Sequence, residues 1–323
     1  MGTALRILLM LLTVAGFSLA SESIRICYPD GVFRFGSPVS TADKGFILSR
    51  AFESVDGSAP NVWVYDREGK AVTSAILWLE DAAKVRVFDV GVDYDGTAVA
   101  SGYVTRADGT AEAVIGIIGR GGRIERVIRT NPFVARFVTV GPDRVIWAAG
   151  RDIEATQRGR DYDMVRSYSM DGRFLHSAVP RSSAASVQDP VPATGKTGRT
   201  HLRGSSTNVV FYSGVMNRLI VFDRAGAIVN DWSPPVPWRN ARMGGFGTDA
   251  ASIYALFRGD DGHRGAFRFD RQAGNWVLIK DTYTPPGERV RFGLLRGTDA
   301  GALVFTNRKM PESCVTRLPV PGP

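Results

Sequence analysis

The chain has 323 residues, of which 44% are hydrophobic and 22% charged, with 36 glycines and 17 prolines. This apolar content excludes a disordered chain, and so many glycines and prolines are typical of a globular protein with many turns. The formal net charge is +8, but no run of Lys and Arg exceeds two residues. A solubilised surface therefore explains the charge better than a polyanion-binding tract does.

Residues 1–20 have the features of a signal peptide. Arg6 precedes an apolar run over 7–17 that is short for a bilayer span, and Ser18-Leu19-Ala20 offers small residues to a signal peptidase. We expect cleavage after Ala20 and export to a periplasm or to the outside of the cell. The alternative is an uncleaved membrane anchor, whereas a lipoprotein is disfavoured because no cysteine follows the cut site.

The remaining chain, 21–323, reads as one domain of short strands. Helical periodicity is nearly absent, while segments rich in Val, Ile, Phe, Tyr and Trp recur between Gly, Asp and Asn. Two kinds of turn alternate along the chain. One is a polar turn before an apolar strand, and the other is a strand–turn–strand hairpin whose glycine supplies a positive φ. The polar turns lie at Asp43, Asp95, Asp143, Asn208, Asp249 and Asp299, and the hairpin glycines are Gly69, Gly122, Gly172, Gly226 and Gly274.

Two hairpin turns in each period of about 50 residues imply four strands per period, which is one propeller blade. Six polar turns predict six blades. The sixth glycine hairpin would fall beyond residue 323, so the last blade lacks its outermost strand. A spare strand at 24–28 would complete that blade and leave no open edge in the ring.

This alternation resembles the six-bladed β-propellers of the NHL-repeat and TolB-like type, over nearly all of residues 24–320. The resemblance implies an all-β fold of four-stranded antiparallel blades. Because it is carried by turn chemistry, it implies no particular activity. A seventh blade would need another pair of turns, and only 178–204 has room for it but lacks a strand pattern.

The mature chain has two cysteines, Cys27 and Cys314, near its opposite ends. In an exported protein such a pair predicts a disulfide. The six-blade count places Cys27 on the added strand and Cys314 on its neighbour, where the bond would lock the seam of the ring. The alternative is two buried free thiols. Neither cysteine has a second Cys or a His at metal-ligand spacing.

Few residues point to catalysis. His176, His201 and His263 have no partners at ligand spacing, and we expect each on the surface or in a loop. Gly195-Lys196-Thr197 lacks the upstream glycine, the strand and the helix of a P-loop. The turn aspartates are either a ring of cation ligands or turn residues whose carboxylates accept hydrogen bonds from backbone amides, and their recurrence in blade after blade favours the turn. These aspartates are Asp95, Asp143, Asp249 and Asp299.

Calcium-dependent lactonases and quinoprotein sugar dehydrogenases share this broad architecture, but their site residues cannot be matched to this chain. Asn208, which stands where other blades have Asp, is a candidate channel ligand. Residues 181–203 form the longest gap between turns and are rich in basic residues, so they either bind a ligand or form an insertion without a role. Residues 232–239 are aromatic and proline-rich, and packing between blades is favoured over a ligand-facing rim.

The sequence therefore predicts an exported, monomeric propeller that binds a ligand or a protein without catalysis. We expect a protein or small-molecule partner of anionic character, and no transmembrane helix in the mature chain. No cofactor is expected. The alternative is a lactonase-like hydrolase with a divalent cation such as Ca²⁺ in the central channel. The ligand-binding candidates are Arg181, Lys196, Arg199, Arg203 and Asn208.

Overall fold

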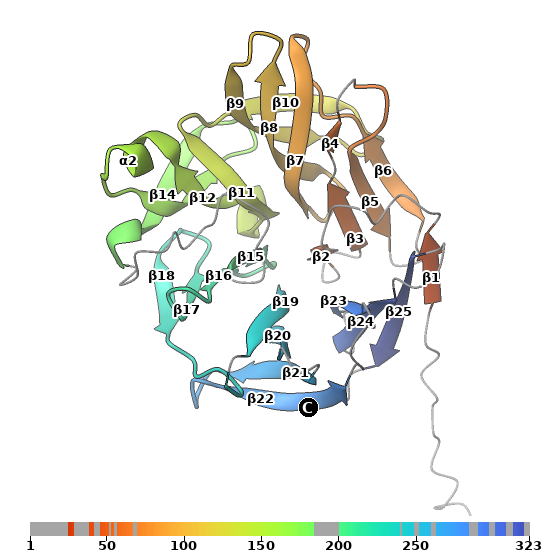
Figure 1. Ribbon diagram of the computed structural model, residues 1–323, viewed down its shortest axis with the longest axis vertical. Helices are drawn as coiled ribbons and strands as arrows, with labels where there is room; N and C mark the ends of the chain where they lie inside the picture. Colours follow the sequence, from red (N-terminus) through yellow and green to blue (C-terminus); the bar gives the residue numbers. More distant parts are fainter. Residues whose placement is uncertain are drawn as a thin grey trace, which may run out of the picture.

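The structure is a computed structural model that describes residues 25–28, 39–41, 46–51, 53–54, 57–66, 70–183, 200–239, 241–248, 252–259, 263–283, 290–296, 301–307 and 313–319. In these ranges the strands form six sheets that follow one another around a ring (Figure 1). The prediction of an all-β, six-bladed propeller is confirmed.

Each sheet is one blade, whose strands follow one another from the innermost to the outermost. Blade 1 has β2 (Val39–Thr41), β3 (Phe46–Ala51), β5 (Val62–Asp66) and β6 (Ala71–Ala75). Blade 2 has β7 (Ala82–Val92), β8 (Ala98–Arg106), β9 (Ala111–Ile118) and β10 (Ile124–Arg129). Blade 3 has β11 (Phe133–Val140), β12 (Ile146–Asp152), β13 (Asp163–Tyr168) and β14 (Phe174–Pro180).

Blade 4 has β15 (Thr200–Gly204), β16 (Val209–Ser213), β17 (Arg218–Phe222) and β18 (Ile228–Trp232). Blade 5 has β19 (Arg242–Thr248), β20 (Ile253–Arg258), β21 (His263–Asp270) and β22 (Asn275–Tyr283). Blade 6 has β23 (Val290–Arg296), β24 (Gly301–Asn307), β25 (Ser313–Pro319) and β1 (Arg25–Tyr28). A short fifth strand, β4 (Glu53–Ser54), pairs with β7 and places Glu53 in register with Arg86.

The N-terminal strand closes the ring, as the missing sixth hairpin predicted. β1 pairs antiparallel with β25, and Cys27 lies in register with Cys314. Opposed residues of neighbouring antiparallel strands have Cα atoms about 4.5 to 5.5 Å apart, which is within the reach of a disulfide. The pairing of the backbone is therefore as expected, and the bond between the two sulfur atoms stays a prediction.

The antiparallel order sorts the turns onto two faces of the ring. Both the polar turns and the glycine hairpins lie on one face, which we name the turn face. The hairpins between the second and third strands, and the connections between blades, lie on the other, which we name the connection face. Four of the predicted glycines have positive φ, and the fifth, Gly69, lies outside the described residues. These four are Gly122 (93°), Gly172 (91°), Gly226 (89°) and Gly274 (65°).

The apolar core lies between neighbouring blades rather than inside any one sheet. One cluster joins Ile115 and Ile117 of blade 2 to Phe133, Val138 and Ile146 of blade 3, and all five are at most 3% exposed. Similar clusters join blades 1 and 2, 3 and 4, and 4 and 5. At these four seams, each blade therefore buries apolar side chains against its neighbour.

Helices are few in the described ranges, as the sequence predicts. A short α-helix, α2 (Ile153–Gln157), follows β12 on the connection face, and the carboxylate of Asp152 caps it by accepting from the Ala155 amide at 2.9 Å.

The C-terminal end of the expected insertion over 181–203 is a strand in the structure. Thr200–Gly204 is the innermost strand of blade 4, and Arg181–Ser183 is a 3₁₀ turn, η3. Residues 184–199, with Lys196 and Arg199, lie outside the described residues. The sequence does not show this strand because two of its polar residues are buried by contacts with other blades, His201 against Phe246 and Arg203 beside Asp89.

Candidate functional site

A cleft of about 500 Å³ lies between blades 2 and 3, within the size range of small-molecule pockets. It is lined by the first halves of β7 and β11 and by the last parts of β8 and β12, so it belongs to the connection face. The lining residues are Lys84, Arg86, Phe88, Tyr103, Thr105, Val134, Arg136, Arg151 and Ile153.

The alternation of β7 explains why its polar residues reach the cleft. Val85 and Val87 are buried in the core between blades 1 and 2, so Lys84, Arg86 and Phe88 project from the opposite side of the strand. On β8, Tyr103 and Thr105 stand opposite Arg86 and Lys84 in register. Near the connection face, one side of blade 2 therefore packs against blade 1, and the other presents cations and hydroxyl groups to the cleft.

Two β-bulges place the central pair of the cleft. The register of β7 with β8 shifts at Phe88, and that of β11 with β12 shifts at Arg136. A bulge leaves one residue unpaired and re-aims its side chain. The guanidinium carbon of Arg136 lies 3.8 Å from the centre of the Phe88 ring, and that of Arg86 lies 5.8 Å from it. These distances are those of cation–π contacts.

The cleft collects positive charge. Four of the nine lining residues are cations, and among the described lining residues none is Asp or Glu. Burial lowers the pKa of Arg136 to about 10, and repulsion by Arg86 and Arg151 adds to the effect. Arg136 remains protonated at neutral pH, but its charge has an unfavourable environment.

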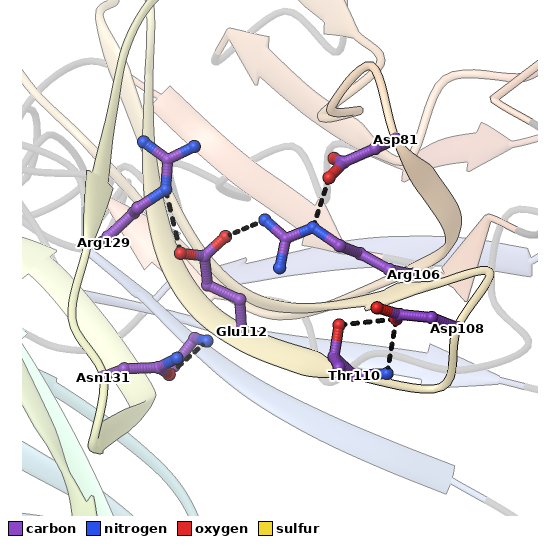
Figure 2. A network of polar contacts seen from close by, with 8 residues as sticks. Asp81, Arg106, Asp108, Thr110, Glu112, Arg129 and Asn131 are labelled. Atoms are coloured by element: carbon purple, nitrogen blue, oxygen red, sulfur yellow. Dashed lines mark hydrogen bonds and ion pairs between the residues drawn. The ribbon is translucent and has the colours of Figure 1, made fainter.

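Neighbouring arginines on the same face are neutralised instead (Figure 2). Arg106 pairs with Asp81 and, at 2.7 Å, with Glu112, and the other oxygen of Glu112 pairs with Arg129 at 2.8 Å. The hydrogen bond to Asp81, followed by that to Glu112, raises the pKa of Arg106. On the connection face, carboxylates therefore balance Arg106 and Arg129, whereas Arg136 in the cleft is repelled by Arg86 and Arg151.

The centre of the ring holds a buried polar cluster from three blades. The Asp89 carboxylate accepts from the Val138 amide at 3.0 Å and lies 3.6 Å from Nη1 of Arg203. Burial raises the pKa of Asp89 to about 6, although Arg203 and the amides of Val138 and Val90 oppose the rise. Asp89, Val138 and Arg203 thereby link the innermost strands β7, β11 and β15.

His201 is buried rather than on the surface or in a loop, so that expectation is wrong. It is 7% exposed and stacks against Tyr212 and Phe246, with Phe137 near it at 6.5 Å between ring centres. Burial, aided by Arg203, lowers the pKa of His201 to about 3, so the ring is neutral. A neutral imidazole packs here as an aromatic side chain does.

The other two histidines differ from each other. His176 is exposed on β14, as expected, whereas His263 lies half-buried in β21 against the indole of Trp238 at 4.8 Å.

The turn aspartates of blades 2 and 3 support the structural interpretation. Asp95 accepts from the Thr97 amide at 2.8 Å, which is the predicted turn bond. Arg144 of blade 3 pairs with both Asp93 and Asp95 at 2.8 Å, so a guanidinium occupies the place between these carboxylates. Asp143 instead pairs with Arg224 at 3.6 Å. Asp249 and Asp299 lie outside the described residues.

The other predicted ligand residues do not meet at one place. Asn208 is buried and bonds within its own turn, where its side chain accepts from Ser205 at 3.1 Å and donates to Thr207 at 3.2 Å. Arg181 lies at the start of η3, with its amide bonded to the Tyr162 carbonyl. Ligand binding by Arg181, Arg203 and Asn208 stays a prediction.

The aromatic segment 232–239 packs as predicted. Trp232 lies edge-on to Phe269 at 5.0 Å between ring centres, and Trp238 contacts Phe257 and Phe267 at 6.3 and 5.7 Å. These contacts join blade 4 to blade 5 and leave the two indoles in the core between those blades.

Within the described residues, no three His, Cys, Asp or Glu side chains are grouped closely enough to hold a metal ion. In the same ranges none of the helices has the length and apolar character of a membrane span.

No protein-family model matches this chain, and no curated protein matches it. Solved structures match over most of its length. They include U3-55K (TM-score 0.49, 8% identity, 90% of this chain and 100% of that one). The WD40 repeats of RRP9 have a TM-score of 0.48 and 10% identity, over 92% of this chain and 87% of that one. TolB from Acinetobacter baumannii has a TM-score of 0.40 and 9% identity, over 91% of this chain and 63% of that one. No ligand or activity follows from these likenesses, and the propeller assignment depends on the order of strands in the six sheets.

Proposed function

We propose that this chain is an exported, non-catalytic binding module that captures an anionic group of its ligand in the cleft between blades 2 and 3. The observation that carries the proposal is Arg136. Its guanidinium is stacked on Phe88, half-buried, and repelled by Arg86 and Arg151. An anion in the cleft would relieve that repulsion, and the partial burial of Arg136 would strengthen their attraction.

The balanced arginines nearby support this interpretation. Arg106 and Arg129 share Glu112, so the sequence places carboxylates beside arginines where charge balance serves the fold. Repelling cations cost free energy in the empty protein. A protein retains such an arrangement most readily where a ligand offsets the cost, as pKa values shifted by like charges in a cleft generally suggest.

The test is a calorimetric titration at low ionic strength with benzoate, and with benzyl alcohol as its uncharged match. We expect benzoate to bind and benzyl alcohol not to bind. Arg136→Met should weaken benzoate binding, whereas Arg120→Met, which removes the same charge from an exposed turn of blade 2, should not. Equal binding by wild type and Arg136→Met would place the anion elsewhere.

The other two parts of the proposal have separate tests. Export predicts that the secreted chain starts at or near Ser21, which mass spectrometry of the mature protein measures. Absence of catalysis predicts no hydrolysis of lactones or esters by the purified chain. Hydrolysis that is lost on chelation and restored by Ca²⁺ would instead support the hydrolase alternative.

A further inference from the structure

We propose that the ligand of this cleft is a hydroxy acid, an organic anion that also carries a hydroxyl group. This inference rests on the proposed function and adds the chemical class of the ligand. It depends on Tyr103 and Thr105, which bring two hydroxyl groups to the same cleft as Arg86 and Arg136.

The two hydroxyl groups reach the cleft from one side of β8. Tyr103 and Thr105 are two residues apart on this strand, so their side chains project from the same face, about 6.7 Å apart along the strand. Both residues are half-buried, and Tyr103 stands opposite Arg86 in register. Because opposed residues of antiparallel strands are neighbours, the side chain of Tyr103 starts beside one of the cations that would hold the anion.

The fold does not use these two hydroxyl groups. Among the described residues, neither the hydroxyl of Tyr103 nor that of Thr105 has a hydrogen-bond partner. The hydroxyl of Thr139 on β11, in contrast, accepts from the Gly204 amide at 2.9 Å. Ser101, the next residue on this side of β8, also lacks a hydroxyl partner in the described ranges, but it is fully buried. A ligand in the cleft can therefore meet the hydroxyl groups of Tyr103 and Thr105 but not that of Ser101.

The cations and the hydroxyl groups of the cleft suit different groups of a ligand. Charge-assisted hydrogen bonds are about twice as strong as neutral ones, so an anionic group gains most from Arg86 and Arg136. A carboxylate only accepts hydrogen bonds, whereas a hydroxyl both donates and accepts. The single oxygen of a ligand hydroxyl can therefore accept from one of Tyr103 and Thr105 and donate to the other. An acid without a hydroxyl would displace water from these two side chains and give them no bond in return.

The rest of the cleft suits the carbon skeleton of such an acid. The rings of Phe88 and Tyr103 lie 6.5 Å apart between centres and are tilted, so an apolar group of the ligand can contact them. The volume of about 500 Å³ is that of a site for a small molecule. A hydroxybenzoate combines the three features, because it has an anionic group, a hydroxyl and an apolar ring, and it therefore serves as the probe.

The experiment titrates two pairs of probes into the full mature chain by calorimetry at pH 7.5 and low salt. One pair is 4-hydroxybenzoate and 4-methylbenzoate, and the other is 3-hydroxybenzoate and 3-methylbenzoate. Within each pair the charge and the ring are the same, and a methyl group replaces a hydroxyl of similar size. We expect the hydroxy member of at least one pair to bind about 5- to 50-fold more tightly, although the methyl group is more apolar, because the methyl group leaves the hydroxyls of Tyr103 and Thr105 unpaired.

Conservative variants assign the hydroxyl groups. Tyr103→Phe and Thr105→Val each remove one hydroxyl and keep nearly the same shape, and each should shift the preference for the hydroxy member toward equal binding of the pair. Tyr94→Phe removes a phenolic hydroxyl from the polar turn of blade 2, on the turn face, and should keep the preference of the wild type. Arg136→Met should weaken both members of a pair, because both carry the anionic group. Thermal unfolding checks that each variant is folded.

The outcomes separate this inference from the proposed function. If the two members bind equally in both pairs, the hydroxy-acid class is wrong, while binding of these benzoates would still support the anion-binding function. If Tyr103→Phe and Thr105→Val both keep the preference of the wild type, the hydroxyl is recognised elsewhere and the assignment to this cleft is wrong. If none of the benzoates binds, both proposals are wrong.

Discussion

Two adjacent glycines at the seam between blades 1 and 2 give the sharpest test of the fold, because a Cβ on one of them would collide with the neighbouring blade and a Cβ on the other would not. Gly121 and Gly122 belong to the glycine hairpin of blade 2 and have φ of 99° and 93°. A Cβ on Gly121 would have no neighbour within 4 Å. A Cβ on Gly122 would lie 2.1 Å from the backbone oxygen of Ser74, on the outermost strand of blade 1. Alanine at either position therefore strains the turn, but only Gly122→Ala forces the two blades apart.

The expected magnitudes follow from these contacts. The positive φ costs an alanine about 1–2 kcal/mol at either position. At Gly122 the backbone of β6 must also withdraw by about 1 Å to reach the 3.0 Å that real Cβ contacts respect, and such overpacking costs about 1–3 kcal/mol more. We therefore expect Gly121→Ala to destabilise the protein by about 1–2 kcal/mol, and Gly122→Ala by about 2–5 kcal/mol.

Urea unfolding of the two variants and the wild type measures both values. The difference between the variants isolates the contact with Ser74, since the strain of the turn is common to them. Equal destabilisation would show that blade 1 does not approach Gly122, and the packing of the first seam as described would be wrong.

Three further predictions concern the ion pairs and the closure of the ring. Arg144→Met should lower the free energy of unfolding in urea by about 1–3 kcal/mol, because it leaves the buried Asp93 without its cation. Arg224→Met removes an exposed ion pair and should cost less than about 1 kcal/mol. Similar values for the two variants would contradict the link between blades 2 and 3. The pKa of Asp89 is raised to about 6 in the folded protein, so its carboxyl binds a proton more readily when folded than when unfolded. The stability of the wild type should therefore grow relative to that of Asp89→Asn by up to about 3 kcal/mol as the pH falls from 7 to 4. A loss of stability in that window would mean that the pKa is lowered rather than raised. Non-reducing peptide mapping should find Cys27 linked to Cys314, and reduction should lower stability by an amount on the order of 5 kcal/mol; two free thiols in the exported protein would exclude the bond.

The sequence was sufficient for the architecture because turns obey the repeat. Gly122, Gly172, Gly226 and Gly274 recur about every 50 residues and all have positive φ, so each marks one blade, and the six polar turns between them predict the number of blades. The need to close the ring also placed the strand that contains Cys27 beside the last blade. These are properties of the backbone, which a periodic pattern of turn residues expresses directly.

The cleft could not be predicted from the repeat, because the residues that line it differ from one blade to the next. Phe88 and Arg136 stand at equivalent places in successive innermost strands, 48 residues apart, which is one blade period. A comparison of the repeats position by position would have set the two side by side. The bulges that carry them break the alternation of each strand, and so neither residue stands out in its own segment.

Grouping the basic residues by their position in the sequence did not reveal the cleft, for a related reason. The basic residues near 181–203 were grouped by sequence, yet Arg203 lies at the centre of the ring beside Asp89, and His201 is packed among aromatic rings. The cations that gather in space come from β7, β11 and β12, far apart in the sequence. Only the ring brings them to one cleft.

A crystal structure of the mature chain grown with benzoate tests the central claim most directly. We predict the carboxylate in the cleft between blades 2 and 3, with its oxygens within about 3 Å of the guanidinium nitrogens of Arg136. The phenyl ring should lie against Phe88 or Tyr103. An empty cleft at a saturating concentration, or benzoate bound on another face of the ring, would contradict the account.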